Sequence, residues 1–306
     1  MTIKLSNSEL QTFKECRRRW WLSYYRALKP KGQDFTGALV LGTRIHASLE
    51  AYYSLGTPLL QAHATLVEID RNLILAAFED PSELNTEAEL GRIMLEGYEQ
   101  WIQEEAIDQE FDIVSLEERV SVPLFNGEVE LQGKLDMRVR RKSDGVRLFN
   151  DFKTTGVSIA EFASMAAMNE QVKTYMLLET LKTGEETRTD GALFTLLRKV
   201  KRTAAAKPPF YAQIEVHHNV FTMRAFWNSI HSVIADLMKA RTALDAGEAH
   251  SSVVYPHPTR DCRWKCQFFT VCTMFDDGSA VEEALNDMYE VTDPYAYYGT
   301  DKKGSE

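Results

Sequence analysis

Apolar side chains recur at helical spacing through the first third of the chain. Residues 6–27 begin with Ser6, which can cap a helix, and Glu9 follows at the spacing of a capping box, so we expect a helix there. A second helix is expected at about 43–55, and acidic amphipathic helices are expected over roughly 59–110. This part of the chain is therefore predicted to be helical.

From residue 113 onward apolar and polar positions alternate, which is typical of half-buried strands. Two turn pairs, Asn126-Gly127 and Asp144-Gly145, divide this region, and together they predict a three-stranded meander over 113–125, 128–141 and 146–153. The pattern then predicts a helix at about 159–183, strands near 190–200 and 210–218, and a helix at about 220–246. The acidic last 30 residues predict a loosely held tail. This order of elements indicates an α/β fold.

Charge is distributed unevenly along the 306 residues, whose net charge is −10. Acidic residues gather between residues 79 and 118 and again after residue 275, which leaves a net positive charge on the rest of the chain. A nucleic acid is therefore a permitted partner. There is no secretory signal pattern and no run of 18 apolar residues, so we expect a cytoplasmic protein that does not enter a membrane.

The two turn pairs bring charged side chains together. If the first forms a two-residue turn, Glu117 faces Asp136, and if the second does the same, Asp136 faces Lys153. Side chains two positions apart share a face of a sheet, so Asp151 joins this cluster. If the pairing of the strands is shifted by two residues, the cluster stays on one face of the sheet and Asp136 lies directly opposite Asp151. A shift of one residue would distribute these side chains over both faces.

Neighbouring carboxylates repel each other, so such a cluster is protonated, neutralised by a base, or occupied by a divalent cation. Lys153 alone cannot neutralise three carboxylates. Oxygen ligands suit Mg²⁺ or Mn²⁺, and a nearby lysine can orient a water and stabilise charge on a phosphate. The cluster is thus the outline of a phosphodiester-hydrolysing site. The alternative is an exposed sheet face that carries an ordinary salt bridge.

Four short motifs surround this cluster: Gly42-Thr43-Arg44-Ile45-His46, Gly133-Lys134-Leu135-Asp136, Asn150-Asp151-Phe152-Lys153-Thr154 and Gln171-Val172-Lys173-Thr174-Tyr175. In this order they resemble the signature of the PD-(D/E)XK nucleases, specifically the RecB-like exonuclease branch. The resemblance implies a restriction-endonuclease-like core, in which helices flank a mixed central sheet. It covers roughly residues 6–277 and does not account for the acidic helical insert or the tail.

The resemblance also implies roles for individual residues. The metal ligands would be His46, Asp136, Asp151 and the backbone carbonyl of Phe152, with Lys153 beside the attacking water. A histidine among oxygen ligands favours Mn²⁺. The general alternative for His46 is a half-buried polar residue of a helix.

Three further residues match the family pattern. Gln171 and Tyr175 lie one helical turn apart, so they share a face and could contact DNA or support the ligands. For Tyr175, packing of the helix against the sheet is an equally good explanation. Glu117 matches an acidic position that is common in the branch.

Four cysteines are present, Cys16 near the amino end and Cys262, Cys266 and Cys272 close together. Closely spaced thiols without a companion histidine pattern favour a metal or cluster site over disulfides. One early and three late cysteines resemble the layout of AddB-type nucleases and CRISPR-associated adaptation nucleases, which implies a 4Fe-4S cluster that joins both ends of the nuclease. Zinc is the alternative, because the gap between Cys262 and Cys266 is longer than is common in those relatives.

These observations predict five segments: an N-terminal helix with the first cluster cysteine, a helical region with the Gly-x-x-x-His element, the nuclease core, a three-cysteine segment and an acidic tail, over 1–30, 31–112, 113–250, 251–277 and 278–306. The predicted function is that of a metal-dependent DNA exonuclease in recombination, repair or DNA end processing, resembling stand-alone enzymes of bacteriophages that work in the host cytoplasm. No phosphate-binding loop is present, so any helicase or recombination protein would be a separate partner.

Basic residues offer contacts for DNA with a free end. They lie in the first helix, at Lys14, Arg17, Arg18 and Arg19, and in a run that starts at Arg198 and ends at Lys207. Trp20, Trp21, Tyr24 and Tyr25 could stack on unpaired bases, or could belong to the core. Two other functions remain open: a non-catalytic DNA-end-binding or assembly protein whose metal is structural, and a zinc-stabilised transcription module.

Overall fold

The computed structural model describes residues 2–32, 34–183 and 189–298. Within it the chain forms two compact units, each built from segments that are distant in the sequence. The first unit comprises Met1–Gly32, Ser121–Gly133 and Val220–Glu306, and the second comprises Gln33–Val120 and Lys134–Asn219.

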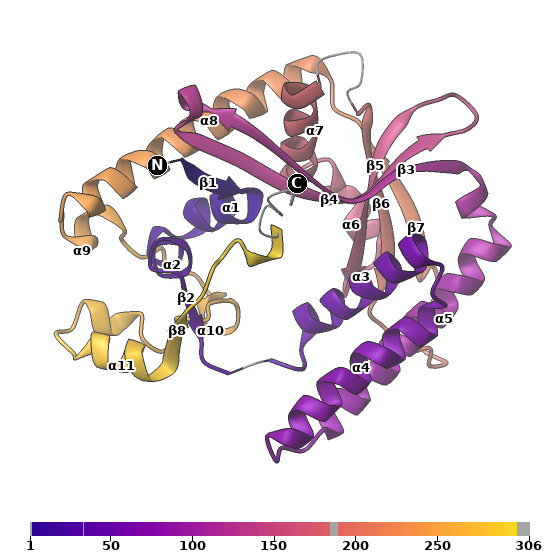
Figure 1. Cartoon of the computed structure of the whole chain (residues 1–306), viewed down its shortest axis with the longest axis horizontal. Helices are drawn as coiled ribbons and strands as arrows, with labels where there is room; N and C mark the ends of the chain where they lie inside the picture. The colour runs from indigo at the N-terminus through magenta and orange to yellow at the C-terminus, as the bar shows by residue number, and fades with distance from the viewer. Residues whose placement is uncertain (1, 33, 184–188, 299–306) are drawn as a thin grey trace, which may run out of the picture. The chain divides into compact units, whose positions relative to one another are not determined.

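The second unit carries most of the central sheet. Strand β4 (Val129–Arg141) pairs antiparallel with β5 (Arg147–Thr155), β5 pairs parallel with β6 (Gly191–Arg198), and β6 pairs antiparallel with β7 (Tyr211–Val216) (Figure 1). A further strand, β3 (Phe111–Leu124), pairs with β4. Nearly every residue of β6 is buried, which is why its sequence is mostly apolar rather than alternating. The sheet is mixed and has helices packed on it, as a restriction-endonuclease-like fold requires.

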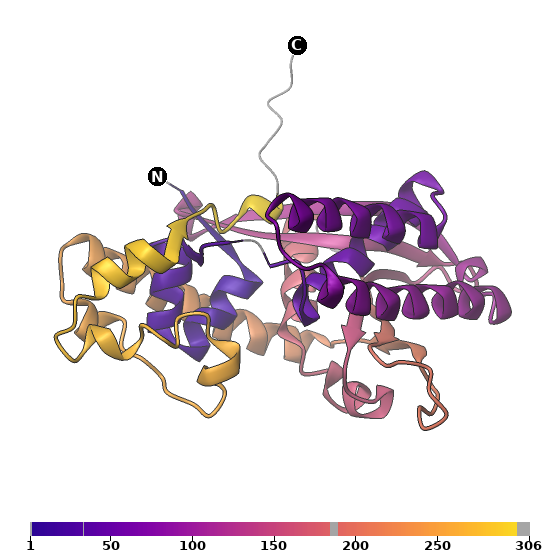
Figure 2. The same cartoon turned by 90° about the horizontal axis from the view of Figure 1, so that it is seen from below.

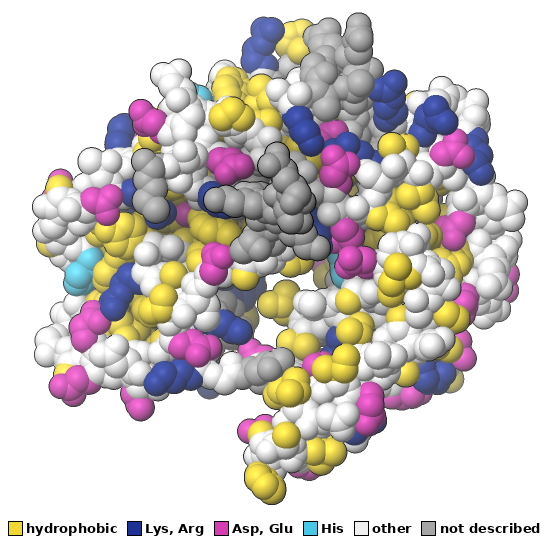
Figure 3. Space-filling model, viewed as in Figure 1, with side chains coloured by type: hydrophobic (Ala, Val, Ile, Leu, Met, Phe, Trp, Pro, Cys, Tyr) yellow, Lys and Arg dark blue, Asp and Glu magenta, His cyan; other side chains and the backbone are white. Residues whose placement is uncertain are grey.

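Three long helices precede the sheet in the second unit: α3 (Ala38–Leu55), α4 (Leu59–Ala76) and α5 (Ser82–Glu104). Both views show α4 and α5 side by side (Figures 1 and 2). The core lies between α3, α5 and one face of the sheet, where it includes Leu41, Ile45, Leu49, Tyr98, Met137, Val139, Phe152, Leu193 and Leu197. The outer side of the α4–α5 hairpin exposes apolar side chains (Figure 3), among them Ile69, Leu73, Leu75 and Phe78.

The opposite face of the sheet is covered by α7 (Glu170–Thr183). The ring of Tyr175 meets the ring of Phe149 edge-on at 5.6 Å, and Nη2 of Arg138 lies 2.6 Å from the carboxylate of Glu179. The single helix expected over 159–183 is in fact two, because α6 (Ile159–Ala166) ends before α7 begins.

The first unit joins the two ends of the chain. Strand β1 (Ile3–Ser6) runs parallel to residues 129–132 of β4, and β2 (Leu28–Pro30) pairs antiparallel with β8 (Tyr289–Val291). Its longest helix is α8 (Val220–Asp245). None of these three short strands was expected from the sequence, since each has too few residues for a visible alternation.

The helix expected over 6–27 is interrupted. Helix α1 (Asn7–Glu15) begins after Ser6, whose hydroxyl accepts a hydrogen bond from the backbone N–H of Glu9, as the capping pattern predicts. It ends at Cys16, whose backbone is extended, and α2 (Arg17–Trp20) follows. Trp20 and Trp21 are buried, so they belong to the core rather than to a base-stacking surface.

The prediction of a loosely held tail is wrong for residues 281–291, which form α11 (Val281–Met288) and β8. Tyr295 beyond them donates a hydrogen bond to the buried carboxylate of Glu9. Residues 299–306 of the predicted tail lie outside the described residues. In the described part of the chain, no helix combines the length and apolarity needed to cross a membrane.

Candidate functional site

The register of β4 and β5 decides how the acidic cluster is arranged. Met137 pairs with Asn150 and Arg138 with Phe149, so the next position along sets Asp136 opposite Asp151. This is the two-residue slip that preserves the shared face. The connection is longer than a two-residue turn because the hairpin closes between Arg141 and Val146, whose backbone N–H and carbonyl lie 2.9 Å apart.

The loop of that hairpin is held by its own side chains. Asp144 accepts a hydrogen bond from the backbone N–H of Val146 at 3.1 Å, and the guanidinium of Arg141 lies 2.9 Å from the same carboxylate. An aspartate that accepts from the backbone two residues on stabilises a wider turn than the Asp-Gly pair alone suggests. This local bonding accounts for the shifted register.

Glu117 lies near the carboxylate cluster. It adopts a left-handed backbone conformation inside β3, with φ at 50°, which is unusual for a residue of this type. Its carboxylate forms an ion pair with Lys134. It contributes to the negative charge around the cluster rather than to the pair of carboxylates at its centre.

Asp136 and Asp151 are both almost completely buried, with 8% and 4% of their surface exposed. Oδ2 of Asp136 accepts a hydrogen bond from the backbone N–H of Phe152 at 3.0 Å. Burial, followed by the charge of Asp151, raises the pKa of Asp136 to about 8. Two buried carboxylates that repel each other can both be ionised only if a positive charge lies beside them.

Lys153 supplies one such charge. Its Nζ lies 2.8 Å from Oδ2 of Asp151 and donates a hydrogen bond of 2.8 Å to Oε1 of Gln171. The amide nitrogen of Gln171 in turn donates to the hydroxyl of Tyr175 at 3.0 Å. The structure therefore links Asp151 and Lys153 by an ion pair, and Lys153, Gln171 and Tyr175 by two hydrogen bonds.

The start of α7 places Gln171 within reach of Lys153. Oδ1 of Asn169 accepts hydrogen bonds from the backbone N–H groups of Gln171 and Val172 at 2.9 and 3.3 Å, which is N-cap bonding. This cap begins a new helix, which is why the predicted helix over 159–183 is broken. Asn169 was not singled out in the sequence, although an asparagine just before Glu170 and Gln171 is a recognisable cap signal.

His46 lies on α3, and its Nδ1 is 3.4 Å from Oδ2 of Asp136. A second contact joins its ring to the backbone of Phe152. Burial lowers the pKa of His46, and so favours the neutral imidazole that can bind a metal. His46, Asp136, Asp151 and the backbone of Phe152 thus lie near one another.

The glycine of the Gly-x-x-x-His element has a packing role. Gly42 lies one helical turn before His46 on α3, and a Cβ atom at Gly42 would lie 3.2 Å from Oγ1 of Thr154. The absence of a side chain therefore allows α3 to approach β5 closely. That approach is what carries His46 to the carboxylates.

The donor set suits a divalent cation by its chemistry: two carboxylates, a neutral imidazole and a backbone carbonyl, with hard oxygen ligands predominating. In residues 2–32, 34–183 and 189–298, however, no three His, Cys, Asp or Glu side chains are arranged so that they could already hold a metal ion. The reason at this site is visible, because Asp136 bonds to the Phe152 N–H and Asp151 pairs with Lys153.

All four cysteines line one pocket of about 490 Å³ in the first unit. None of them is in a disulfide. The backbone N–H groups of His257 and Thr259 point at the sulfur atoms of Cys16 and Cys262, at 3.4 and 3.3 Å. Burial raises the pKa values of Cys266 and Cys272. Four thiols thus line one cavity and N–H donors are directed at two of the sulfur atoms, but within the described residues the thiols are not arranged so that they could already hold a metal ion.

Arg18 is enclosed beside this pocket, with only 2% of its surface exposed. Its guanidinium forms two hydrogen bonds with Asp276, at 2.7 and 2.8 Å, and a third with the carbonyl of Cys272 at 2.9 Å. Arg18 therefore cannot contribute to a basic surface. Arg19 pairs with Glu15 at 3.1 Å, whereas the guanidinium of Arg17 lies over the ring of Tyr255 at 5.4 Å.

The basic run after β6 is also partly used for folding. The guanidinium of Arg198 donates to the carbonyls of Lys207 and Pro209, at 3.0 and 3.1 Å, which closes the loop on itself. Arg202 lies over the ring of Phe210 at 3.8 Å. The exposed cations of this run are Lys201 and Lys207.

Comparison with protein families matches residues 4–273 to the PD-(D/E)XK nuclease superfamily. Among solved structures, one described as the crystal structure of SSO0001 is 12% identical, covers 76% of this chain and 84% of its own, and superposes with a TM-score of 0.34. A comparison with curated proteins found no match. The family match spans both units and all the motifs described above.

Proposed function

This chain belongs to the PD-(D/E)XK nuclease superfamily, which implies a metal-dependent nuclease, and from that premise we propose that it is a deoxyribonuclease acting on DNA ends. The observation that carries the proposal is the pair of buried carboxylates, Asp136 and Asp151, with Lys153 at 2.8 Å from the second. Buried, mutually repelling acids are costly to maintain, and a catalytic role explains why they are kept.

His46, Asp136, Asp151 and the carbonyl of Phe152 would hold Mg²⁺ or Mn²⁺. When bound, such an ion would supply positive charge that stabilises the charge developing on a phosphate, and it would acidify a water. Burial and the charge of Asp151 raise the pKa of Asp136, so a cation that binds near neutral pH would displace the proton of this carboxyl and supply the positive charge that the two acids lack. His46 binds as the neutral ring that its lowered pKa favours.

Lys153 contacts the attacking water or the substrate phosphate in this proposal. Its Nζ has two bonds in the present arrangement, to Asp151 and to Gln171, and an ammonium group offers a third donor. That donor can hold the attacking water or a phosphate oxygen. Gln171 and Tyr175 limit the positions that the ammonium can take, so we assign them a positioning role.

We further propose that Cys16, Cys262, Cys266 and Cys272 hold a 4Fe-4S cluster, with zinc as the alternative. The support is the shared pocket and the N–H groups directed at two of the sulfur atoms. A centre bonded to residue 16 and to residues 262–272 stabilises the first unit by closing a long loop. Action in recombination or repair, a bacteriophage origin and a separate helicase partner are proposals that rest on the motif resemblance alone.

Digestion of matched linear and circular DNA tests the catalytic proposal. We expect loss of the linear form with Mn²⁺ or Mg²⁺, no loss with EDTA, and persistence of the circular form. Asp151→Asn and Lys153→Met should each reduce the rate at least about a thousandfold. Glu105→Gln, at an exposed position just after α5, is the matched control and should cleave normally.

The outcomes separate the candidate functions. DNA binding without cleavage by the wild-type protein under any of these metals would support a non-catalytic end-binding protein instead. Cleavage of the circular form at the same rate would make it an endonuclease. For the cysteine site, quantification of iron and zinc after anaerobic purification identifies the metal, and Cys266→Ala should lose both the metal and the stability of the first unit.

A further inference from the structure

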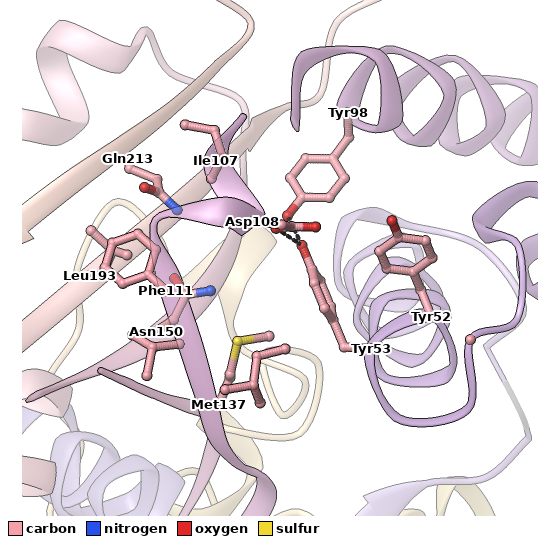
Figure 4. A pocket seen from close by; sticks show the side chains of 13 residues that line it. Tyr52, Tyr53, Tyr98, Ile107, Asp108, Phe111, Met137, Asn150, Leu193 and Gln213 are labelled. Carbon is pink, nitrogen blue, oxygen red and sulfur yellow. Dashed lines mark hydrogen bonds between the residues drawn. The ribbon is translucent and has the colours of Figure 1, made fainter. Parts of the chain in front are cut away.

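A cavity of about 350 Å³ lies in the second unit on the sheet face that carries Met137 and Asn150. Those residues are the chain neighbours of Asp136 and Asp151, and successive side chains of a strand point to opposite faces. The cavity is therefore separated from the candidate catalytic carboxylates by the sheet itself. Its walls come from the end of α3, the start of β3 and the residues just before it (Figure 4).

Two polar side chains that line the cavity, Asn150 and Gln213, are joined through the hydroxyl of Thr195. The hydroxyl of Thr195 donates to Oδ1 of Asn150 at 2.7 Å and accepts from Nε2 of Gln213 at 3.3 Å. Thr195 is fully buried, and Asn150 is 5% exposed. A hydroxyl has one proton, so it can donate to only one of the two amides and must accept from the other.

This hydrogen bonding determines what the two amides offer to the cavity. Asn150 retains its N–H donors and Gln213 retains its carbonyl acceptor, and neither group has a partner among the described residues. If the hydroxyl proton pointed the other way, both amides would be reversed, and the cavity would still receive one donor and one acceptor. A ligand edge that carries an acceptor beside a donor is complementary to these two amides.

The walls are aromatic and carry a negative charge at one side. Tyr52, Tyr53 and Phe111 line the cavity, and Asp108 accepts a hydrogen bond from the hydroxyl of Tyr53 at 2.9 Å. Aromatic rings favour a planar ligand that can stack. The carboxylate of Asp108 disfavours a phosphate in the same space and can accept from a sugar hydroxyl or an amino group.

We propose that this cavity binds a nucleobase, with Asn150 and Gln213 bonding its polar edge and the aromatic rings contacting its face. The base is either that of a free nucleoside or an unpaired base of a DNA strand, since both present the same planar edge. This site goes beyond the proposed nuclease function, because it lies on the opposite face of the sheet from Asp136 and Asp151.

Binding of the four deoxynucleosides to the full-length protein in EDTA tests the proposal by calorimetry, with deoxynucleoside 5′-monophosphates as a second set. We expect one site per chain, and weaker binding of the monophosphates because of Asp108. Gln213→Leu should weaken nucleoside binding about tenfold through loss of one hydrogen bond. Tyr52→Leu, at a partly exposed position, is a second variant in case Gln213→Leu does not fold. Gln100→Leu, on an exposed face of α5, is the matched control.

A fluorescent single-stranded oligonucleotide distinguishes the two sources of the base. If the oligonucleotide is displaced by deoxynucleoside and weakened by Gln213→Leu, the cavity takes a base of the strand. If its binding is unaffected while the nucleoside binds, the ligand is free nucleoside. Absence of nucleoside binding at millimolar concentration, or binding that neither variant alters, overturns the proposal. None of these measurements depends on cleavage, so failure of the proposed nuclease function would show separately.

Discussion

Replacement of Asp136 by asparagine should make the metal-free protein more stable while it abolishes DNA cleavage. Asp136 is buried beside Asp151, and its pKa is raised from 3.8 to about 8. Asparagine has the same shape, can keep the hydrogen bond from the Phe152 N–H, and carries no charge that burial would penalise. The same substitution removes a proposed metal ligand. Stability and activity should therefore change in opposite directions.

The size and pH dependence of the effect follow from proton linkage. Between pH 4 and pH 8 the folded protein retains a proton that the unfolded chain has released, so the stability of the metal-free wild type falls as pH rises through this window. A pKa difference of about four corresponds to roughly 5 kcal/mol at pH 8 as an upper limit, because each pKa unit is worth about 1.4 kcal/mol. Relaxation of the buried pair reduces this value, and we expect at least about 2 kcal/mol to remain.

Thermal and denaturant unfolding in EDTA at pH 5 and pH 8 measures the effect. In EDTA the Asp136→Asn protein should be more stable than the wild type mainly at pH 8, where its melting temperature should be higher by at least about 3 °C. Addition of Mn²⁺ should stabilise the wild type but not the variant. Glu105→Gln is the control, since Glu105 is an exposed acid outside this site. A variant that is no more stable than the wild type at pH 8, or equally more stable at both pH values, would refute the assignment of Asp136 as a buried, repelled acid.

Three other substitutions are informative. Gln171→Leu should slow cleavage more than it weakens DNA binding, because Lys153 loses the acceptor that positions it; equal losses in both assays would contradict a positioning role. Gly42→Val should lower both the melting temperature and the cleavage rate, since even a Cβ would lie 3.2 Å from Thr154, and a wild-type melting temperature would refute the close approach of α3. Burial raises the pKa of Glu9 to about 7. The free energy of unfolding therefore falls as pH rises from 4.5 to 7. Glu9→Gln should remove this decline, so that at pH 8 the variant is more stable than the wild type by up to about 3 kcal/mol. An unchanged pH profile would show that Glu9 ionises normally.

Local pattern was sufficient to predict which side chains share a face. The alternation along β4 and β5 groups Asp136, Asp151 and Lys153 on one face for any even register, and the structure has such a register. The cap at Ser6 was likewise predictable, because capping depends on atoms only three residues apart. These features follow from the sequence because the side-chain period of a strand and the first turn of a helix are local properties.

Tertiary structure decided the exact partners. Asp136 faces Asp151 rather than Lys153 because Asp144 stabilises a wider loop, and Lys153 reaches Gln171 because Asn169 begins a new helix. Neither choice can be read from periodicity, since each depends on competition between side-chain and backbone hydrogen bonds.

Which charged side chains are buried or paired was also decided only by the tertiary structure. Arg18, in the middle of a basic run, is enclosed by Asp276, a residue more than 250 positions away. Strands β1, β2 and β8 of the first unit are too short to recognise in the sequence. They form by pairing with strands that are distant in the sequence, β1 with β4 and β2 with β8. The sequence by itself thus determined the type and face of the chemical groups, whereas long-range packing decided which of them meet, because burial and Coulomb energies depend on distance in space rather than on separation along the chain.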